Sequence, residues 1–557
     1  MSARRASTMQ VSRAVIDRLQ DNGIDTVFGI PGTQTLPLND AITDAPGLRY
    51  VMARHETAVT HQAWGYAETS GRPAATLVVP GPGDMNAMNG LKNALNDCTP
   101  LVHLAVETDP EIRGGDGIHE TPPETYDTVV KENVLVEAPE RTAVVLEEAI
   151  AAAETPPKGP VRVGIPKSFL KTDVPVATPG TYDRTRLEGV PEDDLQAAVD
   201  LLASAEDPVI VAGGGVRTAE ASDHLRRVVD RLDAPVVTTY KGKGVLPETG
   251  DAPVAGTLAG SAAPELLELL ASADAALAVG TDFDAVATRA WSVDLPETVV
   301  HVTLEPDDLG TGYDVAVGIV ADAREALVAL EEGLADRGLE TDPSVARDRA
   351  QAVRTATSER LGELRDGSPP LTSVAALETI REALPEEAIV TADAGGFRVW
   401  GLNVFAAGGP RSYVNPGSWA TMGTGVPSGI GAQCANPDAD VVVLTGDGGL
   451  MMCVHELHTA VAEDLPITVV VFANADYAII SDQADRDYGL EREAYAWPDA
   501  PIDFTALAES MGMETIRAAH PDEIRSALAG ALETDAPVLV EVPTDPGEPQ
   551  ASDWMSD

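Results

Sequence analysis

The sequence predicts an α/β protein with three domains, each with a parallel sheet flanked by helices. Its 557 residues, 44% of them apolar, exceed what a single hydrophobic core usually supports. Short apolar runs alternate with helical patterns in three blocks, and this alternation favours parallel sheets. We place the domains at residues 1–171, 190–340 and 370–557.

The expected strands are apolar runs that end at glycine, proline or a polar residue. The first block has the helical segment "SRAVIDRLQDNG" and the runs "TVFGIP", "AATLVVPGPG" and "PLVHLAVE". The second block has "PVIVAGGGV", "APVVTTY", "AALAVG" and "TVVHVTLE". A charged helix, "PSVARDRAQAVRTATSERLGELRDGSPP", links it to the third block, whose strands lie in "AIVTADAGG", Val441–Ile480 and "APVLVEVP".

The charge of the chain limits its partners. It has 89 acidic and 38 basic residues, a formal net charge of -51, so we expect no nucleic-acid partner. An anionic small substrate can still bind in a local cationic pocket. The composition resembles that of proteins from salt-loving archaea, where salt screens the repulsion. Without a run of membrane-spanning length or a signal peptide, we expect a cytoplasmic protein with no membrane partner.

The sharpest chemical signal is the turn Gly446-Asp447-Gly448-Gly449, between a buried strand and a helix. The glycines allow a tight turn, and the free N–H groups of the helix start favour a phosphate. A carboxylate beside a diphosphate needs a divalent cation between them, and Mg²⁺ keeps phosphate oxygens among its ligands. Asn474, at the end of the next strand, offers a second oxygen ligand.

The backbone carbonyl of Asp476 offers a third oxygen to the same cation. The alternative is an ordinary βαβ unit in which the aspartate only caps the helix. Because the asparagine stands in register at the end of the neighbouring strand, we favour the metal-diphosphate interpretation.

This spacing resembles the thiamine-diphosphate motif of the acetolactate synthase and 2-oxo-acid decarboxylase superfamily. A second asparagine, frequent in that motif, is Ala475 here. Further segments resemble the family in its order along nearly the whole chain: "GIPGTQTLPLNDAI", "ARHETAVTHQAWGYAETSGRPAA", "VPGPGDMNAMNGLKNALNDCTPLVHLA", "VIVAGGGV" and "GSWATMGTGVPSGIGA". The resemblance implies the thiamine-diphosphate-binding fold twice, as an N-terminal pyrimidine-binding and a C-terminal diphosphate- and magnesium-binding domain, with a Rossmann-like middle domain.

The resemblance assigns roles to individual residues. Glu56 would hydrogen-bond the pyrimidine ring of the cofactor and so promote loss of the thiazolium C2 proton; the alternative is a helix charge paired with Arg54 or His55. His119 stands where acetolactate synthases carry glutamine, and it either assists proton transfer or is a solvated loop histidine. The remaining expected cofactor contacts are Pro31, Pro82 and Asn86 near the pyrimidine, Met422 as the wedge that bends the cofactor (or a core methionine), Gly395 and Gly396 over the diphosphate, and Tyr477, Ala478 and Ile479 beside it.

By the same resemblance, the protein is a transferase or lyase of branched-chain amino acid biosynthesis. It would decarboxylate pyruvate and transfer the two-carbon unit to a second 2-oxo acid, as a homodimer or homotetramer with thiamine diphosphate and Mg²⁺. A decarboxylase that releases an aldehyde and a non-catalytic scaffold remain alternatives. In acetolactate synthases the middle domain holds FAD, but the usual arginine is Asp282 here, which leaves FAD open.

Overall fold

The computed structural model describes residues 8–176, 189–339 and 343–551. Contacts within the chain divide it into two compact units. The first unit comprises Met1–Arg186, Trp419–Asp438 and Cys453–Ile467, and the second comprises Leu187–Ser418, Ala439–Met452 and Thr468–Asp557. Two segments from the C-terminal part of the sequence therefore pack with the N-terminal part.

The first unit is built on a six-stranded parallel sheet in the order β3-β2-β4-β5-β7-β6. Strands β2, β4, β5 and β7 are buried over their whole length, as expected of a parallel sheet covered on both faces. The strands are β2 (Thr26–Gly29), β3 (Arg49–Met52), β4 (Ala74–Val78), β5 (Leu101–Glu107), β6 (Glu132–Leu135) and β7 (Pro160–Pro166). A separate antiparallel pair joins β1 (Thr8–Gln10) to β8 (Asp173–Pro175).

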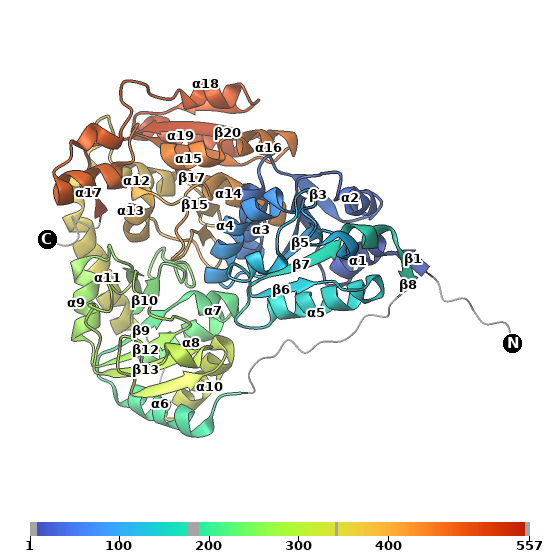
Figure 1. Ribbon diagram of the computed structural model, residues 1–557. Helices are drawn as coiled ribbons and strands as arrows, with labels where there is room; N and C mark the ends of the chain where they lie inside the picture. The colour runs from blue at the N-terminus through green and yellow to red at the C-terminus, as the bar shows by residue number, and fades with distance from the viewer. Residues whose placement is uncertain (1–7, 177–188, 340–342, 552–557) are drawn as a thin grey trace. The chain divides into compact units, whose positions relative to one another are not determined.

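Two helical layers cover this sheet, and Figure 1 shows them on opposite sides of β5 and β7. Strand β5 illustrates the alternation, because Val102 and Leu104 join the core under the first layer while His103 faces Asp84 in the second. The first layer contains α1 (Val11–Asp21), α2 (Leu36–Thr43) and α5 (Thr142–Glu154). The second contains α3 (Glu56–Ser70) and α4 (Pro82–Asn96), and α14 (Gly425–Ala435) packs against α3 with α16 (Glu456–Ala462) beside it.

Helices α3 and α14 touch backbone to backbone. A Cβ atom on Gly65 would lie 2.2 Å from the carbonyl oxygen of Ser428, and one on Gly431 would lie 1.8 Å from that of Gln62. Glycine is therefore required at this crossing, where any larger residue would push the helices apart.

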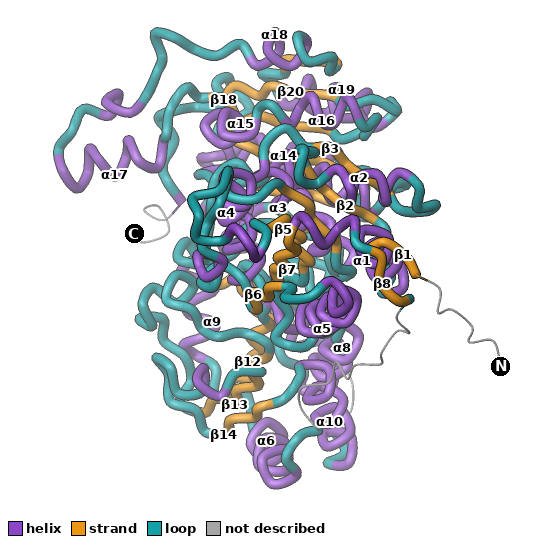
Figure 2. Tube along the Cα trace, turned by 45° about the vertical axis from the view of Figure 1, so that its right-hand side comes forward, coloured by secondary structure: helices purple, strands orange, loops and turns teal. Residues whose placement is uncertain are grey.

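The second unit contains a parallel sheet in the order β11-β10-β9-β12-β13-β14. Figure 2 shows α6, α8 and α10 beside it, and their apolar residues share one core with it, whereas α9 and α11 share a second core on the other face. The strands are β9 (Pro208–Ala212), β10 (Val236–Thr239), β11 (Val254–Leu258), β12 (Ala275–Val279), β13 (Thr298–Thr303) and β14 (Val317–Val320). The helices are α6 (Glu192–Ser204), α7 (Gly214–Thr218), α8 (Ser222–Leu232), α9 (Pro264–Ser272), α10 (Ala323–Asp336) and α11 (Ser344–Arg360).

The second unit also contains a third parallel sheet, in the order β16-β15-β17-β18-β20-β19. Its core includes apolar residues of α12, α13 and α19. The strands are β15 (Ile389–Ala392), β16 (Tyr413–Val414), β17 (Val441–Gly446), β18 (Thr468–Ala473), β19 (Glu514–Arg517) and β20 (Val538–Pro543). The helices are α12 (Ser373–Ala383), α13 (Gly396–Val404), α15 (Asp447–Cys453), α17 (Ala478–Tyr488), α18 (Phe504–Glu509) and α19 (Pro521–Leu532).

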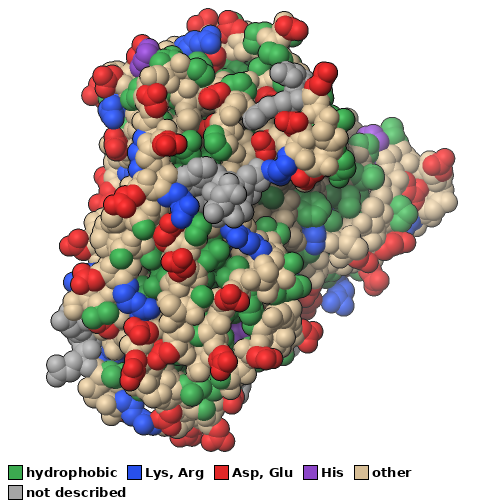
Figure 3. Space-filling view, turned by 90° about the vertical axis from the view of Figure 1, so that its left-hand side faces the viewer, with side chains coloured by type: hydrophobic (Ala, Val, Ile, Leu, Met, Phe, Trp, Pro, Cys, Tyr) green, Lys and Arg blue, Asp and Glu red, His purple; other side chains and the backbone are tan. Residues whose placement is uncertain are grey.

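Three parallel sheets flanked by helices confirm the predicted fold class. Acidic side chains are spread over the face shown in Figure 3 and do not form one patch. Within the described ranges, no helix combines the length and the apolar character needed to cross a bilayer.

Candidate active site

Three neighbouring strands of the third sheet end at one edge, and residues predicted for the site follow each of them. Strand β17 lies between β15 and β18, and the chain order reverses between β15 and β17. Gly395 and Gly396 follow β15, Asp447 follows β17, and Asn474 follows β18. Ligands of open parallel sheets bind at such a reversal, outside the carboxyl ends of the strands.

The carboxylate of Asp447 is buried and accepts hydrogen bonds from three backbone N–H groups. Oδ2 accepts from Asn474 (3.1 Å) and Ala475 (2.7 Å), and Oδ1 accepts from Gly448 (2.7 Å). Burial raises the pKa of this carboxyl to about 6, and nearby Asp476 adds to the rise, although the three N–H groups oppose it. Asp447 therefore joins the ends of β17 and β18, at a place where a cation would favour its charged form.

The chain turns sharply after β18. The side-chain oxygen of Asn474 accepts a hydrogen bond from the backbone N–H of Asp476 (3.1 Å), and Ala475 between them has a φ of +56°. Tyr477 occupies the N-cap position of α17, and its ring packs edge-on against Trp497 with 5.1 Å between centroids. The first turn of α17 contains Ala478 and Ile479.

A buried aspartate that the sequence analysis missed, Asp393, lies under the glycine turn. A Cβ on Gly449 would come within 2.7 Å of its Oδ2, which also accepts from the Thr445 hydroxyl (3.0 Å). A Cβ on Gly396 would be in ordinary contact with Ile479, at 3.5 Å. The signal for Asp393 was available, because "TADAGG" places an acid directly after a buried strand.

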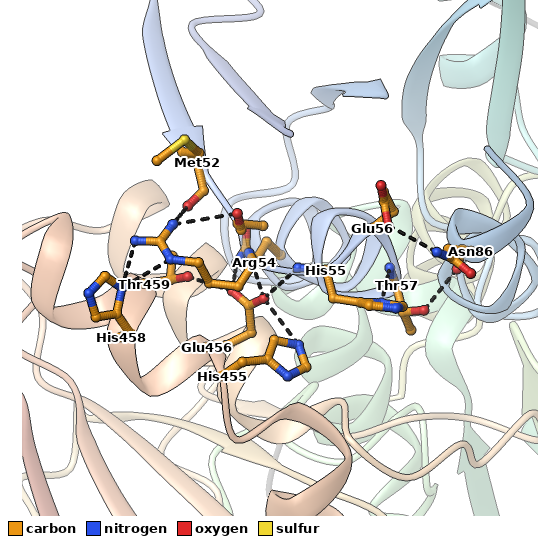
Figure 4. Close-up of polar contacts among 12 residues, drawn as sticks. Met52, Arg54, His55, Glu56, Thr57, Asn86, His455, Glu456, His458 and Thr459 are labelled. Atoms are coloured by element: carbon orange, nitrogen blue, oxygen red, sulfur yellow. Dashed lines mark hydrogen bonds and ion pairs between the residues drawn. The ribbon is translucent and has the colours of Figure 1, made fainter. Parts of the chain in front are cut away.

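The first unit presents Glu56 at the first position of α3. Its Oε2 accepts a hydrogen bond from Nδ2 of Asn86 (3.0 Å), and Oγ1 of Thr57 donates to the carbonyl of Asn86 (2.8 Å), as Figure 4 shows. A Cβ on Gly83 would lie 3.1 Å from Oε1 of Glu56. The start of α4, which begins at Pro82, is therefore held directly against the start of α3.

His119 lies next to this pair of helix starts. Nδ1 of His119 and Nε2 of Gln34 are 3.4 Å apart, which links its loop to the loop of Pro31 between β2 and α2. A Cβ on Gly81 would lie 2.5 Å from the carbonyl oxygen of His119, so the glycine permits this approach. The neighbouring Glu120 accepts the N–H of Gly117 (2.8 Å) within its own loop.

Met422 also belongs to the first unit, in the segment before α14. Asn89 of α4 holds this segment, because Nδ2 donates to Oγ1 of Thr421 (3.0 Å) and Oδ1 accepts from Nε1 of Trp419 (2.8 Å). The half-buried Met422 is therefore tied to the helix that carries Asn86. Met422 and the residues expected near the pyrimidine thus belong to the first unit, and those expected near the diphosphate belong to the second.

The donor set of the second unit suits a cation that brings phosphate ligands with it. Among the described residues, no group of three or more His, Cys, Asp or Glu side chains could hold a metal by itself. Asp447 and Asn474 provide one carboxylate and one amide oxygen at adjacent strand ends. Mg²⁺ is commonly bound through one or two carboxylates together with substrate phosphates, so these residues fit Mg²⁺ with a diphosphate.

Comparison with known proteins identifies the family. Residues 9–128, 195–330 and 393–542 match the N-terminal, central and C-terminal domains of thiamine pyrophosphate enzymes. Acetolactate synthase isozyme 3 large subunit of Escherichia coli is 30% identical over 96% of this chain and 94% of its own length. A probable acetolactate synthase large subunit of Methanocaldococcus jannaschii is 29% identical, with 97% and 93% covered.

A probable 2-ketoarginine decarboxylase of Pseudomonas aeruginosa is 32% identical over 96% of this chain and 94% of its own length. The matches therefore extend over all three sheets. The chain belongs to the family of thiamine pyrophosphate enzymes.

Proposed function

We propose that this enzyme is a carboligase that acts on 2-oxo acids and resembles acetolactate synthase. It decarboxylates pyruvate and transfers the two-carbon unit to a second 2-oxo acid. The observation that supports this most directly is the placement of Asp447 and Asn474 at adjacent strand ends of one unit and of Glu56 at a helix start of the other. Relatives named acetolactate synthase, similar along almost the whole chain, supply the reaction class.

When bound, thiamine diphosphate supplies an electron sink for the pair of electrons that remains after carbon dioxide leaves. Asp447, Asn474 and the carbonyl of Asp476 would hold Mg²⁺. The carboxyl group of Glu56, oriented by Asn86, would share a proton with the pyrimidine nitrogen. Contacts around them would come from Pro31, Pro82, Met422, Gly395, Gly396, Gly446, Gly448, Gly449, Tyr477, Ala478 and Ile479, with His119 at the substrate side.

The test is calorimetric titration with thiamine diphosphate and Mg²⁺ in high salt, followed by product analysis with pyruvate. We expect saturable binding that requires Mg²⁺, and loss of binding in Asp447→Ala. We also expect Glu56→Gln to bind the cofactor but to lose most of the exchange of its C2 proton. An absence of both cofactor binding and carbon dioxide release would favour the non-catalytic scaffold.

The second candidate is a decarboxylase that releases an aldehyde, and the relative named 2-ketoarginine decarboxylase favours it. Product identity separates the two candidates. Acetolactate from pyruvate alone supports the carboligase, whereas acetaldehyde supports the decarboxylase. A panel of 2-oxo acids that includes 2-ketoarginine would then identify the preferred donor.

We further propose that the middle domain binds no FAD. Asp282 lies just after β12 at the carboxyl edge of the second sheet, and burial, together with the charges of Asp284 and Asp308, raises its pKa. An acidic cluster at this edge would repel a dinucleotide diphosphate. Flavin absorbance in the purified protein, or binding of added FAD, would contradict this proposal.

Assembly and location complete the proposal. We propose a homodimer or homotetramer in the cytoplasm of a salt-adapted cell, with domains at 1–171, 190–340 and 370–557. Exposed methionines support contacts between copies of the chain. Met85 on α4 is 51% exposed, and Met451 and Met452 on α15 are 42% and 52% exposed. Light scattering in high salt measures the assembly, and limited proteolysis tests the domain limits.

A further inference from the structure

Glu456, the first residue of α16, is fully buried and accepts four hydrogen bonds. Oε1 accepts from the backbone N–H groups of Arg54 (2.8 Å) and His55 (3.1 Å), as Figure 4 shows. Oε2 accepts from Nε2 of Gln62 (3.0 Å) and Oγ1 of Thr459 (2.7 Å). A buried carboxylate is stable only when its oxygens are satisfied in this way.

Two of these four donors belong to the residues that directly precede Glu56. His55 is the N-cap of α3, and its ring accepts the N–H of Thr57 (3.2 Å). The side chain of Arg54 extends to α16 as well, where Nε lies 3.0 Å from Nδ1 of His458. The backbone that enters α3 is thus held by α16, and the position of Glu56 depends on that backbone.

We propose that Glu456 is a positioning residue that fixes the start of α3 and thereby aims the carboxylate of Glu56 at the pyrimidine of the cofactor. This inference rests on the proposed function, in which Glu56 contacts that ring. In this role Glu456 acts through the backbone of Arg54 and His55 and not through the cofactor. The sequence motifs do not suggest this role. Glu456 begins α16, and the residues that it holds are about 400 positions earlier in the chain.

The hydrogen-bond pattern explains why a carboxylate is needed at this position. Glutamine at 456 could still accept the two backbone N–H groups through one oxygen. Its amide nitrogen would then meet the amide nitrogen of Gln62, so two donors would face each other unless the Gln62 amide turned over and placed its nitrogen where its oxygen now lies buried without a partner. Exchanging the two side chains, in Gln62→Glu with Glu456→Gln, restores one donor and one acceptor and keeps the net charge.

The experiment compares wild type, Glu456→Gln and the exchanged double variant, with Glu463→Gln as the control. Glu463 is a matched control because its Oε1 accepts the backbone N–H of Met52 (3.1 Å), the last residue of β3, two residues before Arg54. Two rates are measured in high salt. The first is amide hydrogen exchange at residues 49–58 without cofactor, and the second is C2-proton exchange of bound thiamine diphosphate.

In Glu456→Gln we expect amide exchange of Arg54 and His55 to be about tenfold faster and C2-proton exchange to be about tenfold slower, because the bond to Gln62 is lost and a neutral amide oxygen holds the two backbone N–H groups less strongly than a carboxylate does. The double variant should return both rates to within about threefold of wild type. Glu463→Gln should affect amide exchange in β3, at Met52, and leave Arg54 and His55 unchanged. If Glu456→Gln does not fold, the double variant provides the test alone. The proposal then requires that the double variant folds and that both of its rates are close to those of wild type.

Unchanged rates in Glu456→Gln, or failure of the double variant to restore them, would overturn the proposal. Faster amide exchange combined with an unchanged C2-proton rate would also overturn it. In that case the contacts of Glu456 would stabilise the backbone before α3 without affecting Glu56. If wild type binds no thiamine diphosphate, the proposed function fails. Amide exchange is measured without cofactor, so it still shows whether Glu456 holds the backbone of Arg54 and His55, and the two failures can be told apart.

Discussion

Asn86 donates a hydrogen bond to the carboxylate of Glu56 across 3.0 Å, and this bond joins the first turn of α4 to the first residue of α3. One side chain therefore orients the group that the proposed reaction depends on. Replacing Asn86 by alanine removes the donor and leaves the carboxylate free to rotate. Since hydrogen bonds to charged groups contribute about 1.5–3 kcal/mol, we expect kcat/KM to fall about tenfold to hundredfold with little change in cofactor affinity. Steady-state kinetics on pyruvate measure the effect, and wild-type values in Asn86→Ala would contradict it.

Gly83 permits the close approach of α4 to Glu56. An added Cβ would lie 3.1 Å from Oε1 of Glu56 and 2.8 Å from Cγ2 of Val79. We expect Gly83→Ala to displace the carboxylate of Glu56. Its kcat should fall clearly, while its unfolding free energy should change little. Gly530→Ala is the matched control, because its Cβ would meet no atom within 4 Å on α19, and we expect it to stabilise the fold by about 0.5–1 kcal/mol. Kinetics and thermal unfolding of both variants separate the two effects.

Arg162 neutralises two buried carboxylates in the core of the first unit. Nε and Nη2 contact Oδ2 of Asp84 at 3.0 and 2.6 Å, and Nη2 also pairs with Glu107. Arg162→Met leaves both carboxylates buried without their cation, so we expect a loss of about 3–5 kcal/mol in unfolding free energy. Arg72→Met removes a surface partner of Asp25 and should cost less than about 1 kcal/mol. Denaturant titrations of the two variants give the comparison, and similar losses would contradict the prediction.

His61 makes the stability of the first unit depend on pH. Its ring is fully buried on α3, its two nitrogens have no hydrogen-bond partner among the described residues, and burial lowers its pKa to about 4. Because this value lies below that of the unfolded chain, stability is fully present above about pH 6.5 and is lost as the pH falls through 4.

The expected difference in unfolding free energy between pH 7 and pH 4 from this residue is about 3 kcal/mol. His61→Leu has no titrating group at this position and should flatten that part of the pH profile without destabilising the protein at pH 7. Unfolding of both proteins across this range, at one salt concentration, provides the measurement. An equally steep profile in His61→Leu would show that other groups cause the loss.

Mixed dimers test whether Glu56 of one chain works with Asp447 of another. Glu56→Gln and Asp447→Ala should each be inactive alone. If the site forms between two chains, the mixed dimer has one site with both substitutions and one intact site, so mixing should restore up to about half of the activity per mixed dimer. If one chain supplies both residues, no intact site forms and mixing restores nothing. Activity after co-refolding the two variants distinguishes these outcomes.

The sequence could predict the central strands because each is an apolar run that is buried on both faces. Runs such as Val441–Gly446 and Thr468–Ala473 show this pattern directly. The edge strand β19 lacks it: its sequence is Glu-Thr-Ile-Arg, it is largely exposed, and it is a strand only because it pairs with β20. Such pairing depends on a partner that is distant in the sequence, which local patterns do not contain.

By itself, the sequence determined the fold class through its apolar periodicity, and its motifs supplied the family and the candidate cofactor residues through their resemblance to known enzymes. Only the tertiary structure decided which side chains support them. Asp393 lies under Gly449, Asn86 orients Glu56, and Glu456 holds the start of α3 from a helix about 400 residues away in the chain. These contacts depend on how helices pack across a sheet, and the burial that makes a carboxylate or an amide effective exists only after that packing has formed.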